Sequence, residues 1–149
     1  MPQSLSKILV HLIFSTKNRE PLIEVELRPR LHAYLIGILD NLKSPSLQIG
    51  GVADHVHILF RLGRSISQAD LVEEVKKSSS KWMKTGNGVP AFSWQAGYGA
   101  FSVGESQAEA VIKHIQNQEE HHRKSTFQEE FRRFLVKYKV EYDERYVWD

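Results

Sequence analysis

Two histidines stand one residue apart in a stretch whose pattern predicts a single β-strand, residues 50–62. Because side chains alternate across a strand, His55 and His57 point to the same face. The alternate positions are apolar, so the opposite face packs on a core. Two imidazoles on one face can offer two nitrogens to one metal ion or one phosphate. An isolated His-x-His pair is more commonly a pair of surface or hydrogen-bonded histidines, so a matching segment elsewhere must support the metal interpretation.

The matching segment is a predicted helix over residues 105–123. His114, Gln118 and His121 are spaced i, i+4 and i+7, so they share one stripe beside the apolar stripe. If this helix docks against the histidine face of the sheet, Gln118 can supply an oxygen as a third ligand. Such a mixed and open coordination suits a catalytic divalent ion better than a closed structural one.

Two other interpretations of these residues stay open. The helix can be an ordinary amphipathic helix whose polar face is solvated. Alternatively, four histidines form a structural metal site: His55, His57, His121 and His122. The second alternative is the weaker, because neighbouring side chains on a helix point about 100° apart and seldom share one ion.

The elements that must position these side chains follow from hydrophobic spacing and from breaks at glycine and proline. Strands are expected over residues 5–16, 47–52 and 50–62 with a turn at 53–54, and a bent strand or short hairpin over 91–95 and 98–103. Helices are expected over residues 24–42, 68–84 and 105–123, and over 126–138, where Thr126 and Glu129 suggest a capping box.

The order β-α-β-β-α-β is the split βαβ, or ferredoxin-like, arrangement. We therefore expect an α+β fold with a four- to five-stranded antiparallel sheet, two helices on one face, and additional C-terminal helices. The second face of such a sheet can stay open, and that is the face assigned to His55 and His57.

Composition limits the class of protein. The chain has 149 residues, of which 41% are hydrophobic, and this favours one domain over residues 1–149. It has no cysteine, which excludes disulfides and thiolate-bound zinc. No apolar run approaches the roughly 18 residues of a membrane span, and the N-terminus lacks a signal-peptide pattern, so we expect a cytoplasmic protein with no membrane partner.

The formal net charge is only +2, so local basic patches must make any contact with nucleic acid. Six cations are candidates for phosphate contacts, at a strand tip, beside the histidines and along a helical stripe: Lys17, Arg19, Arg61, Lys77, Lys81 and Lys84. For any single lysine of this set, a solvated surface position is the alternative.

The motif Asp54-His55-Val56-His57, followed by Ile58-Leu59-Phe60, resembles the His-hydrophobic-His motif of the single-tyrosine HUH transposases. These are small insertion-sequence enzymes and their relatives associated with repetitive extragenic palindromes (REP). The similarity extends over nearly the whole chain, and the other segments that carry it are residues 11–19, 79–82, 94–102, 117–122 and 142–148.

The resemblance implies a protein that cuts one DNA strand beside a hairpin and rejoins ends as a homodimer. It also implies a Mg²⁺ or Mn²⁺ ion held by His55, His57 and Gln118. In the family, a tyrosine on the glutamine's helix attacks the phosphate and forms a 5′-phosphotyrosine. That helix serves the metal site of its own chain or of the partner.

The sequence departs from the family at the nucleophile, because the position four residues before Gln118 is His114. Three accounts are open. The chain can bind DNA without cutting it, another tyrosine can replace the missing one, or His114 can act itself as a nucleophile or as a base for water. The substitute tyrosines are Tyr98, Tyr138, Tyr142 and Tyr146.

The alternative function is therefore an inactive DNA- or RNA-binding regulator that keeps the transposase fold. RNA-recognition modules use a ferredoxin-like sheet too, but they place aromatic residues on its open face, where this chain has histidines.

Overall fold

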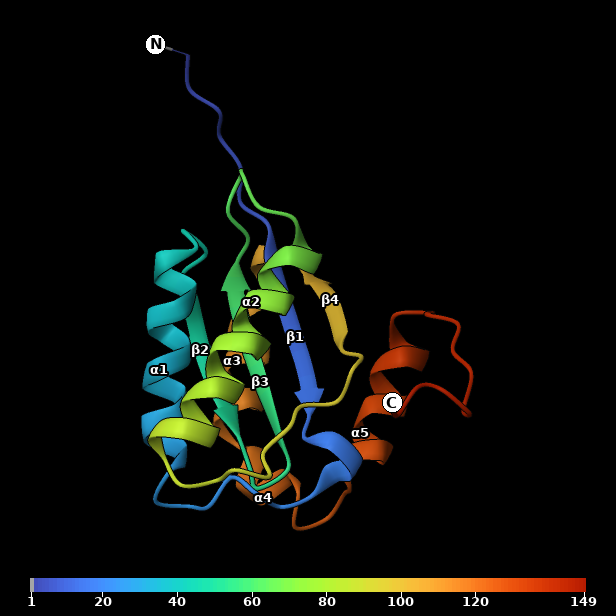
Figure 1. Cartoon of the computed structure of the whole chain (residues 1–149). Helices are drawn as coiled ribbons and strands as arrows, with labels where there is room; N and C mark the ends of the chain where they lie inside the picture. The colour runs from blue at the N-terminus through green and yellow to red at the C-terminus, as the bar shows by residue number, and fades with distance from the viewer. Residues whose placement is uncertain (1) are drawn as a thin grey trace.

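Four antiparallel strands form the centre of the computed structural model, which describes residues 2–149 (Figure 1). They are β1 (Leu9–Ser15), β2 (Ser46–Gly51), β3 (His55–Arg61) and β4 (Gly99–Val103), in the spatial order β2-β3-β1-β4. This is the strand order of the split βαβ arrangement, so the predicted ferredoxin-like α+β fold is confirmed.

Two long helices, α1 (Arg28–Asn41) and α2 (Gln68–Lys81), cover one face of the sheet. The core beneath them takes its sheet residues from the even-numbered positions of β1 and β3, as the alternation of side chains requires. Its fully buried members include Leu12, Phe14, Val56, Ile58 and Phe60. The hydroxyl of Ser67 accepts a hydrogen bond from the Asp70 amide and caps the start of α2.

The second face of the sheet is covered as well, by α3 (Ala108–Gln116), α4 (Gln118–His121) and α5 (Phe127–Lys137). One apolar cluster joins α3 to Leu9 and Leu59, and another joins α5 to Ile13 and Phe101. The histidines of β1 and β3 lie between these two clusters. The face that could have stayed open is thus closed by the C-terminal helices.

Glycines on the two edge strands let these helices approach closely. A Cβ atom at Gly50 of β2 would overlap the backbone carbonyl of Ile115 in α3. A Cβ atom at Gly99 of β4 would come within 2.7 Å of the Phe131 ring in α5. Residues with side chains would push both helices away from the sheet, so the two glycines set the depth of the space that the histidines fill.

Several predicted boundaries were wrong, each for a local reason. The helix expected from residue 24 begins at Arg28, because Pro29 has no amide hydrogen and belongs in a first turn. The helix expected to reach residue 84 ends at Lys81 and continues as a π-helical turn, Trp82–Gly86. Residues 91–95 form no strand but a single bridge between Thr16 and Trp94.

The helix expected over residues 105–123 is divided. A short 3₁₀ turn (Glu105–Gln107) precedes α3, and Asn117, with φ −97° and ψ 22°, separates α3 from α4. The capping box of the last helix is confirmed: Thr126 and Glu129 exchange side-chain to backbone hydrogen bonds at the start of α5.

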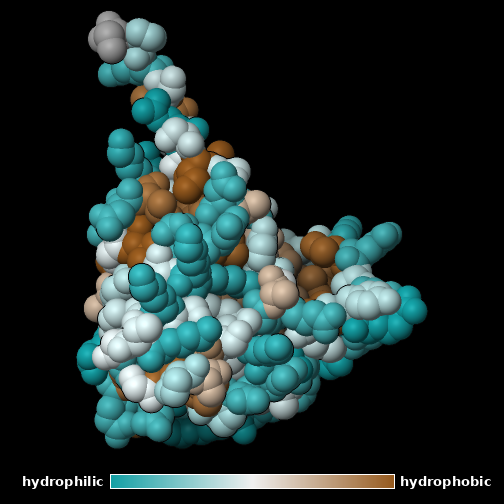
Figure 2. Space-filling model, viewed as in Figure 1, coloured by the Kyte–Doolittle hydropathy of each residue, from teal (hydrophilic) through white to brown (hydrophobic). Residues whose placement is uncertain are grey.

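On the surface, the view of Figure 2 is mostly hydrophilic, with apolar areas where the N-terminal segment joins the fold and over the C-terminal segment. Within the described residues, no helix combines the length and apolar character that crossing a membrane requires.

Candidate metal centre

Six of the chain's seven histidines lie together between α3 and α5, around the carboxylate of Glu130. They come from both central strands and from the C-terminal helices: His11, His55, His57, His114, His121 and His122. The seventh, His32, belongs to α1 on the other layer. A cluster of six imidazoles around one buried carboxylate is not needed for packing, so we interpret it as a candidate functional site.

Strand alternation and register place the three sheet histidines. His11 shares the odd-numbered face of β1 with Leu9 and Ile13, the face that the C-terminal helices cover. The register pairs Ile13 with His57, so His11 is a diagonal neighbour of His57 and their ring nitrogens are 2.8 Å apart.

Glu130 is 2% exposed and contacts histidines through both carboxylate oxygens. Its Oε1 atom lies 2.8 Å from Nε2 of His57, 3.2 Å from Nε2 of His122 and 3.6 Å from Nε2 of His55. Its Oε2 atom lies 2.9 Å from Nε2 of His114 and 3.1 Å from Nε2 of His121. Burial alone would raise the pKa of Glu130, but hydrogen bonds from the histidines hold that pKa well below its usual range.

His55 is oriented from both sides of its ring. Its Nδ1 atom lies 2.7 Å from Oδ1 of Asp54, and its Nε2 atom lies 3.0 Å from Oε1 of Gln118. A carboxylate on Nδ1 fixes the tautomer that leaves the Nε2 lone pair free, which is the usual support of a metal-binding histidine. Gln118, predicted as a third ligand, is 1% exposed and directs its amide oxygen at that nitrogen.

His57 is fully buried, and burial lowers its pKa to about 4 despite the opposing effect of Glu130. Burial, together with the neighbouring His57, also lowers the pKa of His11 well below the ordinary value. Both rings are therefore neutral at pH 7, and neutral imidazole is the form that binds a metal ion.

The spacing of these donors fits a metal shell. With bonds of about 2.1 Å, neighbouring ligand atoms lie about 3.0 Å apart at right angles and about 3.4 Å apart at the tetrahedral angle. The distances from Glu130 Oε1 to the Nε2 atoms of His57, His122 and His55 are 2.8, 3.2 and 3.6 Å. The distance from His55 Nε2 to Gln118 Oε1 is 3.0 Å. These side chains could therefore hold a metal ion, and so could the group His114, His121 and Glu130.

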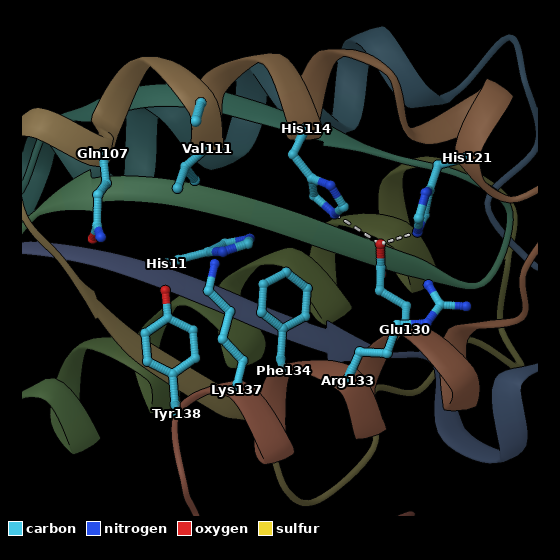
Figure 3. Close-up of a pocket in the computed structure, with 11 residues that line it drawn as sticks. His11, Gln107, Val111, His114, His121, Glu130, Arg133, Phe134, Lys137 and Tyr138 are labelled. Atoms are coloured by element: carbon cyan, nitrogen blue, oxygen red, sulfur yellow. Dashed lines mark hydrogen bonds and ion pairs between the residues drawn. The ribbon is translucent and has the colours of Figure 1, made fainter.

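His114 lies beside a cavity of about 370 Å³ between α3 and α5 (Figure 3). Its ring and that of His121 both point at Glu130, as the close-up shows. Arg133 and Lys137 line the same cavity and are suited to contact an anion that enters it.

None of the four candidate substitutes stands on the helices α3 and α4 that carry His114 and Gln118. Tyr138 lines the same cavity as His114 and directly follows the last residue of α5, eight residues after Glu130. Tyr98 borders a different pocket, lined by α2 on the opposite layer. Tyr142 and Tyr146 are exposed in the C-terminal segment.

The six predicted phosphate contacts do not form one surface. Lys17 and Arg19 follow β1 in a tight turn at the Asp54 end of β3, and the Arg19 guanidinium donates to the carbonyl of Trp148. Arg61 ends β3, six residues or about 20 Å from His55.

The basic stripe lies further still from the histidines. Lys77 and Lys81 are exposed on α2, and Lys84 is exposed in the π-helical turn, so all three belong to the layer across the sheet.

Sequence reasoning missed His11 and Glu130, and it ranked His122 low. The missed signal for His11 was its alternation with Leu9 and Ile13. For Glu130 it was helical spacing, since Arg133 and Lys137 follow it at i+3 and i+7 on one face. His121 and His122 do diverge as neighbours on a helix must, and they contact different oxygens of Glu130.

Comparison with known proteins agrees with the fold. A solved structure of a candidate transposase from Deinococcus radiodurans R1 is similar, with TM-score 0.64 and 23% identity over 79% of this chain and 98% of that chain. A REP-associated tyrosine transposase bound to a REP hairpin is similar with TM-score 0.58 and 12% identity, over 78% and 70% of the two chains. No curated protein sequence matches.

These likenesses concern the fold, and the sequence itself identifies the family. The family profile described as "Transposase IS200 like" matches residues 4–118, which include β1 to β4, the His-x-His strand and Gln118. The chain therefore belongs to the IS200-like transposase family.

Proposed function

We propose that this transposase binds single-stranded DNA that carries a hairpin and acts on it with a divalent ion, Mg²⁺ or Mn²⁺, held by His55, His57 and Gln118. The observation that carries the proposal is the 3.0 Å approach of Gln118 Oε1 to His55 Nε2, which joins α4 to β3 across 63 residues of sequence. Family membership and the hairpin bound by the REP-associated neighbour support the choice of DNA.

Within this site, each residue has a separate task. When bound, the ion would polarise the scissile phosphate and stabilise the charge that develops on its oxygens. His55 and Gln118 fix its position, and Asp54 holds the His55 ring in the required tautomer. Arg133 and Lys137 attract the DNA backbone to the cavity beside His114.

The second candidate function is a regulator that grips hairpin DNA without cutting it. The observation that favours it is that the position four residues before Gln118, where the family has its tyrosine, is occupied by His114. Since this regulator would keep the DNA-binding surface, a cleavage assay separates it from a strand-cutting enzyme. The assay incubates labelled hairpin DNA with the protein in the presence of Mn²⁺ or of a chelator. A strand-cutting enzyme gives DNA fragments with Mn²⁺ and none with chelator, whereas the regulator gives none in either case.

We expect His114→Tyr to restore covalent chemistry. A phenol at this position stands on the helix that leads to Gln118, so its oxygen can attack the phosphate held at His55 and His57. The expected result is a protein–DNA adduct on a denaturing gel with Mn²⁺ and a hairpin from the neighbouring genomic DNA. Adding His57→Ala to this variant should abolish the adduct.

If no such hairpin gives an adduct with His114→Tyr, a retained catalytic site is ruled out, and the binding function stands alone.

We further propose that the protein works as a homodimer in the cytoplasm, where its DNA lies. The exposed hydrophobic residues of the C-terminal segment support self-association: Val136, Val140, Tyr142 and Tyr146. Light scattering on the purified chain measures its mass directly.

A further inference from the structure

The two oxygens of Glu130 divide the surrounding histidines into two groups. Oε1 contacts the rings of His55, His57 and His122, and Oε2 contacts those of His114 and His121. A carboxylate with imidazoles on both oxygens is the geometry of a bridging ligand. His55 and His57 of the first group belong to the site proposed above, whereas the proposed function assigns no role to the second group.

The second group is already arranged as ligands. Nε2 of His114 and Nε2 of His121 lie 2.9 and 3.1 Å from the same oxygen, distances that fit neighbours in one metal shell. The Nε2 atom of His121 is shielded from solvent, and although Oε2 is near it, the described residues offer it no hydrogen bond of acceptable geometry. A buried ring nitrogen that faces a carboxylate without bonding to it has a lone pair available for an ion.

We propose that His114, His121 and Glu130 form a second divalent metal site and that Glu130 bridges it to the first. The proposal rests on the proposed function for the ion at His55, His57 and Gln118. It gives the residue in the tyrosine position a role as a ligand, and it makes the metal centre dinuclear.

Ligand chemistry indicates which ions this site takes. Two imidazoles with one carboxylate select transition metals such as Mn²⁺ and Zn²⁺, whereas Mg²⁺ prefers oxygen ligands. Three protein ligands leave coordination positions open, and both His114 and His121 line the cavity, so those positions face the space that a phosphate would enter. Two ions about 4 Å apart are a recurring arrangement for phosphodiester substrates.

The second site uses residues that the family match does not contain. The match ends at Gln118, and both His121 and Glu130 follow it in the chain. His114 lies inside the match, but there it replaces the tyrosine that the resemblance implies. Because residues 117–122 also carry the family resemblance, His114 is the ligand that sets this chain apart from the family pattern.

The test is to count bound Mn²⁺ ions by equilibrium dialysis of the full chain. We expect two ions for the unaltered protein, one for His121→Ala, one for His57→Ala, and two for the control His32→Ala, which changes the only histidine outside the group. His121 is 28% exposed in its side chain, so its truncation should leave the fold intact. Circular dichroism and thermal melting check this for each variant.

A spectroscopic measurement on the unaltered protein avoids any variant. Two Mn²⁺ ions bridged by a carboxylate are magnetically coupled, so electron paramagnetic resonance at two equivalents should show a broad multiline signal. One equivalent should give the six-line signal of a single ion.

The outcomes separate the two proposals. One ion in the unaltered protein, lost in His57→Ala but kept in His121→Ala, overturns the second site and leaves the proposed function standing. No bound ion at all contradicts both. Two uncoupled ions, or two ions in His121→Ala, place the additional ion elsewhere and overturn the assignment.

Discussion

At the scale of single residues, His11 contributes to the proposed metal site without facing the ion, because it contacts His57 from behind. For His57 to offer Nε2 to an ion, its Nδ1 must carry the proton, and the acceptor for that proton is Nε2 of His11, 2.8 Å away. His11 then keeps its own proton on Nδ1, a buried atom that no described group accepts from. His11 is therefore a positioning residue for His57. It accepts a hydrogen bond from His57 through Nε2, while its own Nδ1–H stays without an acceptor among the described residues.

We predict that His11→Phe weakens Mn²⁺ binding at the His57 site by about 10- to 100-fold, the usual effect of losing a hydrogen-bonding partner behind a ligand. The number of ions should not change, because no ligand is lost. His11→Gln, which returns an acceptor at the same reach, should recover most of the affinity. Isothermal titration calorimetry measures both variants, and equal affinities for His11→Phe and the unaltered protein would sink the assignment.

At the scale of elements, the approach of α3 to β2 decides where Gln118 lies. Gly50 pairs with His57 in the sheet, and the carbonyl of Ile115 in α3 sits directly on it. Because a backbone atom cannot rotate away, a side chain at Gly50 must move the helix.

We predict that Gly50→Ala costs about 1–3 kcal/mol of unfolding free energy, as overpacking does, and weakens metal binding by displacing Gln118. Gly37→Ala is the matched control. Gly37 is exposed in α1 with nothing near its would-be Cβ, so alanine there should stabilise the helix by about 1 kcal/mol. Urea unfolding measures the free energy of unfolding of both variants. If that free energy falls in both variants, or in neither, the packing argument is contradicted.

Sequence alone was enough to predict the sheet, its strand order and the face that carries the histidines. Alternation in β3 and helical spacing around Gln118 are local patterns that survive folding unchanged. Glu130 was missed because its role depends on the histidines of other elements that α5 brings around it, and the helical spacing with Arg133 and Lys137 does not name those partners. The break at Asn117 was also invisible, because no glycine or proline marks it in the sequence.

At the scale of the whole molecule, α3 and α4 pack on the sheet of their own chain. Gln118 contacts His55 of the same chain, and His114 contacts Glu130 of the same chain. In this single chain, all the residues of the proposed site therefore come from one protomer.

We predict that chemistry restored at position 114 acts in cis. A chain that carries His57→Ala and His114→Tyr has the tyrosine nucleophile but lacks a metal ligand. The unaltered chain has all its metal ligands but lacks the tyrosine. A mixture of the two should give no adduct if each helix serves its own site. An adduct on the doubly altered chain, identified by mass spectrometry, would instead show that the helix reaches its partner.

The carboxylate of Glu130, buried and ionised among imidazoles, has a consequence for timing. The negative charge that a cation will need is already present before any cation arrives, and it keeps the rings aimed at their common centre. We therefore expect the chain to fold without the ion and to bind it at a site that is already formed.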